Sequence, residues 1–127
     1  IEYINNHISG DIGTQFKMVK DCLIKNDICS MLEPQHTIKD VIVDMNKHQI
    51  GISVIKNNDE IQGIVTNRDI CLFLKNKNDL NIKVSEIMRK DFHFLNDENT
   101  YIKDINIKRS YLPVIKEGIL LGIVQLN

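Results

Sequence analysis

Thr66 and Asp69 are the residues whose types and spacing best suit ligand binding in this sequence. They follow the apolar stretch Gly63-Ile-Val65 and stand where a helix is predicted to begin. The Asp69 carboxylate has two oxygens that can accept two hydrogen bonds from a diol, and charge-assisted bonds are stronger than neutral ones. The free N–H groups of the helix start suit a phosphate. These residue types can therefore hold hydroxyl groups and a phosphate.

The same spacing also has a structural interpretation, because Thr-x-x-Asp at a helix start is close to a capping box. In that arrangement the threonine and the acidic side chain satisfy backbone N–H groups at the helix end. Thr37-Ile-Lys-Asp40 repeats the spacing at another predicted helix start where no ligand is expected. The spacing alone therefore leaves both interpretations open.

Arg68 and the histidines are the remaining candidates for chemistry. Arg68 could reach a ligand phosphate, or it could be an arginine on the helix surface. His7 has an imidazole that titrates near neutrality and can act as an acid or base, whereas the alternative is a solvated histidine in an Asn-rich segment. His36, His48 and His93 do not cluster in the sequence and are expected at the surface or at strand edges.

Composition excludes several classes of protein. With 127 residues, 43% hydrophobic and 26% charged, the chain is typical of one globular domain. A net charge of −1 with scattered Lys and Arg disfavours nucleic acid as a partner, and no apolar run approaches the roughly 20 residues of a membrane span. Three cysteines without a C-x-x-C pair predict a reduced, cytoplasmic protein without a metal site. Because the chain begins at Ile1, we interpret it as part of a longer protein.

An internal repeat organises the chain. The matching segments are 27–40 with 91–104 at an offset of 64 residues, Ser53-Val-Ile-Lys56 with Pro113-Val-Ile-Lys116, and Gly63-Ile-Val65 with Gly122-Ile-Val124. The second copy is shorter by five residues between its Ile-Lys-Asp and its Gly-Ile-Val. We therefore expect two homologous units, at residues 19–78 and 79–127, preceded by a linker at residues 1–18.

Each copy predicts the order strand, helix, strand, strand, helix after a short helical start at Val19 or Val84. In the first copy Ile38, Val41, Ile42 and Met45 share one helical face. The β-branched stretches 50–55 and 61–65 predict a buried hairpin that turns at 56–59, and the second hairpin turns at Glu117-Gly118. Ile70, Phe73 and Leu74 predict a closing helix over 69–75. Two such small units are expected to pack against each other in an α+β fold.

The second copy is the poorer candidate for a site. The gap after Asp104 is four residues shorter than in the first copy, so the helix there is expected to lose about one turn and keep its apolar face in phase. Gln125 stands where Thr66 stands in the first copy, and the position equivalent to Asp69 lies one past Asn127. If a ligand binds, the first site is favoured.

This doubled unit resembles a tandem of cystathionine-β-synthase (CBS) domains, the Bateman module that binds adenosine-type nucleotides in many enzymes and transporters. The resemblance covers residues 19–127 and rests mainly on Thr37-Ile-Lys-Asp40, the Ser53-Val-Ile strand and Gly63-Ile-Val-Thr-Asn-Arg-Asp69. It implies two pseudo-symmetric β-α-β-β-α units packed as an intramolecular pair. It also implies that Thr66 contacts phosphate or ribose and that Asp69 accepts hydrogen bonds from the ribose hydroxyls.

Upstream, His7-Ile-Ser-Gly-Asp-Ile-Gly13 resembles the His-Pro-Gly-Gly-x-Leu-Gly signature of bacterial arabinose 5-phosphate isomerases of the KpsF/GutQ type. His7, Gly10 and Gly13 match, while Ile8 and Ser9 depart from the pattern. In that family the signature joins a sugar-isomerase (SIS) domain to a CBS pair. The resemblance implies that His7 belongs to the active site of an intact isomerase that interconverts ribulose 5-phosphate and arabinose 5-phosphate, on the way to the Kdo sugar of lipopolysaccharide or capsule.

The sequence therefore predicts a regulatory CBS pair that is not an enzyme by itself. The expected ligand is an adenosine nucleotide or a CMP-Kdo-like molecule, and no cofactor is expected to be required. The expected partners are an upstream SIS domain and further copies of the chain, as a homodimer or homotetramer. The alternatives are a ligand-free dimerisation module, or a CBS pair of another host such as a transporter or dehydrogenase.

Overall fold

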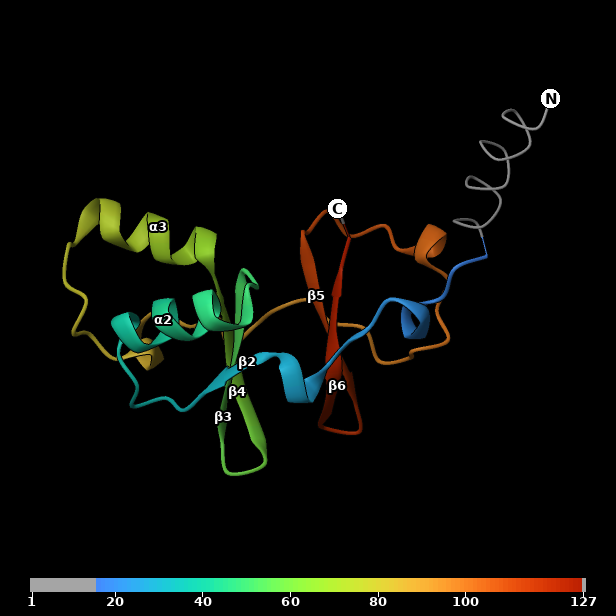
Figure 1. Ribbon diagram of the computed structural model, residues 1–127, viewed down its shortest axis with the longest axis horizontal. Coiled ribbons are helices and arrows are strands. Elements are labelled where there is room, and N and C mark those ends of the chain that lie inside the picture. Colours follow the sequence, from blue (N-terminus) through green and yellow to red (C-terminus); the bar gives the residue numbers. More distant parts are fainter. Residues whose placement is uncertain (1–15, 127) are drawn as a thin grey trace.

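The structure, a computed structural model, describes residues 16–126. In this range it contains two three-stranded sheets, ordered β2-β3-β4 and β1-β6-β5, and two α-helices that lie beside the first sheet (Figure 1). The expected α+β class is confirmed. The elements in chain order are η1 (Val19–Asp21), β1 (Ile24–Lys25), η2 (Asn26–Ile28), β2 (Ser30–Leu32), α2 (Ile38–His48), β3 (Ile52–Asn57), β4 (Glu60–Thr66), α3 (Asn67–Asn76), η3 (Val84–Glu86), η4 (Ile102–Asp104), β5 (Tyr111–Lys116) and β6 (Ile119–Gln125).

Each sheet is built around a hairpin with a two-residue turn. Asn58 and Asp59 join β3 to β4, and Glu117 and Gly118 join β5 to β6. Asn58 has φ 57°, Glu117 φ 53° and Gly118 φ 78°. Positive φ in such turns matches the right-handed twist of the paired strands. Both predicted hairpins are confirmed.

Strand pairing corrects one part of the repeat alignment. Gly63 pairs with Ile55 in the first hairpin, and Gly122 pairs with Val114 in the second. A constant offset of 59 residues therefore relates the two hairpins. The alignment based on the shared Val-Ile-Lys letters is wrong by one residue for β3 and β5, because it places them at an offset of 60.

The second copy lacks a counterpart of α2. Fourteen positions separate Ile38 from Ile52, and only nine separate Ile102 from Tyr111. The predicted shortened α-helix is therefore wrong, since only the 3-10 turn η4 forms there. A helix this short makes too few hydrogen bonds to offset the cost of nucleation.

The loss of an N-cap side chain also disfavours an α-helix at η4. Thr37 caps α2 through its side chain, whereas Tyr101 occupies the equivalent position before η4 and makes no side-chain cap. An N-cap hydrogen bond stabilises a helix by about 1 kcal/mol. The second copy therefore lacks both the length and the cap that α2 has.

The start of each copy lies on the sheet of the other copy. In β1, Ile24 pairs with Ile123 of β6, and Val19 of η1 packs in the cluster that contains Val114 and Val124. In the opposite direction, η3 packs against the two helices, and Arg89 forms an antiparallel bridge with Ile64 of β4. This exchange brings residue 89 beside the end of β4.

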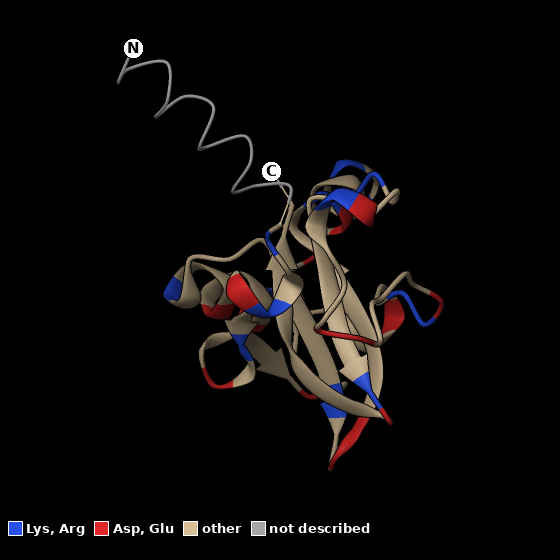
Figure 2. Ribbon diagram, turned by 90° about the vertical axis from the view of Figure 1, so that its right-hand side faces the viewer, with Lys and Arg blue, Asp and Glu red and all other residues tan. Residues whose placement is uncertain are grey.

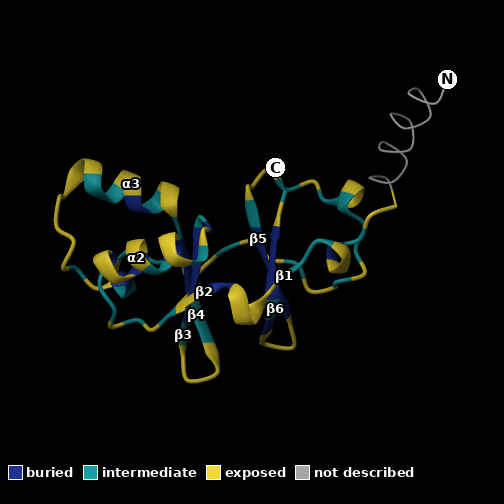
Figure 3. Ribbon diagram, in the orientation of Figure 1, coloured by how far each residue is buried: buried dark blue, intermediate teal, exposed yellow. Residues whose placement is uncertain are grey.

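The described core has three buried clusters, one of which lies between the two sheets. Ile52, Val54 and Ile64 of the first sheet meet Ile115 and Ile123 of the second in one buried cluster. Figure 3 shows the strands as the most buried elements, with exposed residues at the turns and on the outer faces of the helices. Within residues 16–126, no helix is long and apolar enough to cross a membrane.

Candidate functional site

The end of β4 and the start of α3 place the predicted pair Thr66 and Asp69. The Asp69 N–H donates to Thr66 Oγ1 over 3.2 Å, and the Thr66 N–H donates to Asp69 Oδ2 over 3.0 Å. The Thr66 hydroxyl also donates to Asp69 Oδ2 over 2.9 Å. The capping interpretation is therefore confirmed for this pair.

Thr37 and Asp40 form the same capping box at the start of α2, with bonds of 2.9 and 3.2 Å. Asp40 is exposed, and the N–H of Thr37 lowers the pKa of its carboxyl group. The two boxes differ in what reaches the second carboxylate oxygen. Among the described residues, no ion pair involves Asp40.

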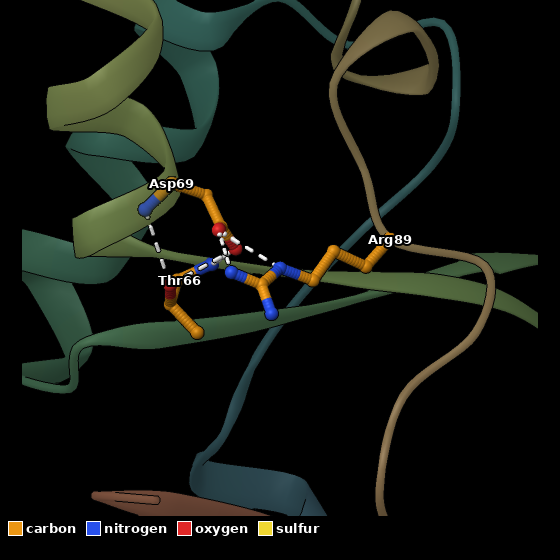
Figure 4. Close-up of polar contacts among 3 residues, drawn as sticks. All are labelled: Thr66, Asp69 and Arg89. Carbon is orange, nitrogen blue, oxygen red and sulfur yellow. Dashed lines mark hydrogen bonds and ion pairs between the residues drawn. The ribbon is translucent and has the colours of Figure 1, made fainter.

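Arg89 engages the second oxygen of Asp69. Its Nε and Nη2 donate to Asp69 Oδ1 over 2.9 and 2.6 Å (Figure 4). The Asp69 side chain is only 10% exposed, whereas the Arg89 side chain is 40% exposed. Figure 4 shows the Arg89 guanidinium reaching from the segment after η3 toward the start of α3. Arg89 thus faces solvent while holding a nearly buried carboxylate.

A cleft of about 320 Å³ lies beside this pair. Its walls come from three places: the end of β4 with the start of α3, the segment after η3, and the start of β5 with the loop that precedes it. Four basic residues line it, namely Arg68, Arg89, Lys108 and Arg109. Asp91 is the one acidic residue among the lining residues.

The excess of positive charge is local. Over the described chain, basic and acidic residues are interspersed (Figure 2), in line with a net charge of −1. The hydrogen bonds and ion pairs found within residues 16–126 include none from the Arg68 side chain. The cleft therefore has cations available for an anionic ligand.

The predicted site residues differ in where they lie relative to the cleft. Thr66 and Arg68 line the cleft, and Asp69 is connected to it through Arg89. His7 lies outside the described residues. Ligand contact by Thr66, Arg68 and Asp69 stays a prediction. Among the described residues, no group of three or more His, Cys, Asp or Glu side chains is arranged to hold a metal ion.

Other cleft residues do not stand out in the sequence. Arg89, Lys108, Arg109 and Tyr111 belong to none of the motifs, and His93, expected only at a surface or strand edge, lines the cleft wall. The glycine of Gly63-Ile-Val65 is the available signal, because a glycine inside a strand often marks a close backbone approach. Here the approaching backbone is that of Arg89.

Comparison with known proteins shows what this fold is similar to. Residues 18–76 match the family model described as CBS domain. No curated protein matches the chain. A CBS-domain containing protein from Agrobacterium tumefaciens is 22% identical, with 87% of this chain and 94% of that chain covered and a TM-score of 0.77.

Two further solved structures are complexes with small molecules. The CBS domain pair of protein MJ0100, in complex with 5′-methylthioadenosine and S-adenosyl-L-methionine, is 24% identical, with 87% and 90% coverage and a TM-score of 0.75. CBSX2 in complex with AMP is 17% identical, with 85% and 89% coverage and a TM-score of 0.70. The described chain therefore has the fold of a CBS domain pair.

Proposed function

We propose that the chain is a regulatory module that binds an adenosine nucleotide in its cationic cleft, because residues 18–76 match the CBS-domain model and the described chain has the fold of a CBS domain pair. The observation that carries this proposal is the gathering of Arg68, Arg89, Lys108 and Arg109 around the start of α3. The complexes of CBSX2 with AMP and of MJ0100 with two adenosine derivatives support the choice of ligand class.

The proposed binding mode follows from the residue types around the cleft. Guanidinium groups hold phosphate oxygens bidentately, and the helix dipole adds partial positive charge at the start of α3. Phe92 and Tyr111 offer aromatic faces for a base. Asp69 has the acceptor oxygens that a ribose diol needs.

A thermal-shift panel of AMP, ATP, CMP and CMP-Kdo tests the proposal. We expect at least one nucleotide to raise the melting temperature, since a ligand that binds only the folded state stabilises it. Asp69→Ala should abolish that shift. If no nucleotide raises the melting temperature, or if Asp69→Ala leaves a true shift unchanged, the proposed pocket is wrong.

We further propose that the module regulates a sugar-phosphate isomerase of the arabinose 5-phosphate type. Only the match of His7, Gly10 and Gly13 to the linker signature supports this host, and these residues lie outside the described range. Regulation requires that the ligand bind two states of the module with different affinity. An isomerase assay of the complete gene product, with and without the bound nucleotide, tests the assignment, which fails if the product does not interconvert ribulose 5-phosphate and arabinose 5-phosphate.

A second candidate function is dimerisation of the chain through its helices. An apolar groove of about 490 Å³ runs between α2 and α3 and is lined by residues that include Ile42, Met45, Ile70 and Leu74. Ile42 is 37% exposed, so apolar surface remains uncovered there. A second copy of the chain would present the same helices, and a two-fold contact of this kind is self-complementary.

A further inference from the structure

The hydrogen-bond capacity of Asp69 is fully used within the protein. Its Oδ2 accepts from the Thr66 N–H and the Thr66 hydroxyl, and its Oδ1 accepts from Arg89 Nε and Nη2. A carboxylate offers about four acceptor positions, so no position remains for a ribose diol. A ligand that uses Asp69 must first remove at least one of these partners.

Arg89 is the partner that can leave. Its main chain is fixed, because its N–H donates to Ile64 O over 2.8 Å and its O accepts from the Ile64 N–H over 3.0 Å. Its side chain is 40% exposed and lines the cleft. The contacts of Thr66, by contrast, form the cap of α3 and would be lost only with the helix start. Rotation of the Arg89 side chain is therefore enough to free Oδ1 of Asp69.

We propose that the Arg89–Asp69 ion pair makes the cleft selective for molecules that carry both a phosphate and a ribose diol. The proposal rests on the proposed nucleotide-binding function. A phosphate group draws the Arg89 guanidinium away from Asp69, and the ribose hydroxyls then take the two acceptor positions that Arg89 leaves on Oδ1. Neither the phosphate alone nor the nucleoside alone can replace Arg89 on Asp69 without a loss of free energy.

The reason lies in what each half leaves unpaired. A nucleoside without phosphate must break two charge-assisted hydrogen bonds to Oδ1 and offers only neutral hydroxyls in return. Inorganic phosphate can attract Arg89 but leaves the Asp69 carboxylate, 10% exposed, without its main partner. AMP supplies a phosphate for Arg89 and hydroxyl groups for Asp69 at once. Its affinity should therefore exceed the affinity expected from adenosine and inorganic phosphate measured separately.

Isothermal titration calorimetry of AMP and adenosine with the wild-type chain and Arg89→Ala provides the test. We expect the wild type to bind AMP and to bind adenosine at least tenfold more weakly, a difference of about 1.4 kcal/mol. In Arg89→Ala, Asp69 is already free, so adenosine should bind roughly tenfold more tightly than it does to the wild type, while AMP binds more weakly. The sign of the change for adenosine is the decisive result.

Arg68→Ala is the matched control, because it removes a cation from the same cleft without touching Asp69. It should weaken AMP binding and leave adenosine binding unchanged. Asp69→Asn tests the same replacement by removing the charge that holds Arg89. It releases Arg89, so tripolyphosphate should bind more tightly than it does to the wild type, and this readout remains if Arg89→Ala does not fold.

The outcomes separate this inference from the proposed function. If the wild type binds AMP and Arg89→Ala binds adenosine no better than the wild type, the exchange is wrong while nucleotide binding stands. The exchange is equally wrong if Arg68→Ala strengthens adenosine binding as much as Arg89→Ala does. If neither AMP nor adenosine binds the wild type or any variant, the proposed function fails, and the exchange fails with it.

Discussion

Gly63 lies directly against the main-chain carbonyl of Arg89. A Cβ atom at residue 63 would lie 2.6 Å from that oxygen, closer than side chains tolerate. Gly122 has the same relationship to the Ile24 carbonyl in the other copy. The repeated Gly-Ile-Val is therefore explained by the crossing of each copy's first segment over the other copy's last strand, a close approach that only glycine permits.

Gly63→Ala should push the Arg89 segment off β4. We expect a loss of about 1–3 kcal/mol in the free energy of unfolding, the range for overpacked positions, together with weaker AMP binding because the Arg89 guanidinium is moved out of the cleft where it would meet the phosphate. Urea denaturation and calorimetry check both effects. The control is Gly118→Ala, since nothing lies within 4 Å of a Cβ there. It should lose stability through its positive φ alone and bind nucleotide normally; an equal binding loss in both variants would contradict the explanation.

Ser30 and Ser53 form a buried polar link between β2, β3 and α2. Ser30 Oγ donates to Asp44 Oδ2 over 2.6 Å and lies 2.6 Å from Ser53 Oγ. Because the Ser30 proton goes to Asp44, Ser53 is the donor in the second bond.

Ser30→Ala should therefore destabilise the protein more than Ser53→Ala. The first variant leaves the buried Ser53 hydroxyl without an acceptor and should cost about 2 kcal/mol, whereas the second leaves the Ser30–Asp44 bond intact. A double-mutant cycle by chemical denaturation measures the coupling between the two positions. Equal losses for the two single variants would show that the assigned bond directions are wrong.

The three cysteines should differ in reactivity. Cys29 is buried, and burial raises the pKa of its thiol to about 11. At pH 8 only on the order of one thiol in a thousand would then be ionised. Cys71 is exposed, so we expect iodoacetamide to label it first and Cys29 last. Mass spectrometry of a timed reaction gives the order, and fast labelling of Cys29 in the folded chain would refute it.

Dimerisation through the helices gives a different prediction. Ile42→Glu places a charge in the groove between α2 and α3 and should shift a dimer toward monomer in light scattering. Ile119→Glu is the control, because Ile119 is 63% exposed at the start of β6 and outside this groove. A wild type that is monomeric at all concentrations, or equal effects of the two variants, would exclude the groove as the dimer contact.

Local sequence signals are enough for the hairpins, α2 and α3. Alternating or continuous β-branched stretches, turn residues and two capping boxes act between neighbours in the chain, so their effects can be recognised from spacing. The absent helix after Asp104 also has a local sign, since Tyr101 replaces the capping Thr37. Length alone suggests one lost turn, whereas the missing cap is the signal that the whole helix is lost.

The cleft could not be derived in the same way. Arg89 meets Asp69 only because the first segment of the second copy crosses onto the sheet of the first copy. No local sequence pattern indicates that crossing. Lys108 and Arg109 reach the cleft from the loop where the second copy has lost its helix. Their contribution depends on how the two copies are placed relative to each other.

The location of nucleotide binding is the central claim, and a titration of ¹⁵N-labelled protein with AMP, followed by two-dimensional NMR, tests it most directly. We predict that shifted amide signals concentrate at residues 66–69, 89–93 and 108–111, while the hairpin tip at residues 57–60 stays unchanged. The absence of shifts at saturating AMP, or shifts confined to residues outside those three segments, would contradict the proposed location.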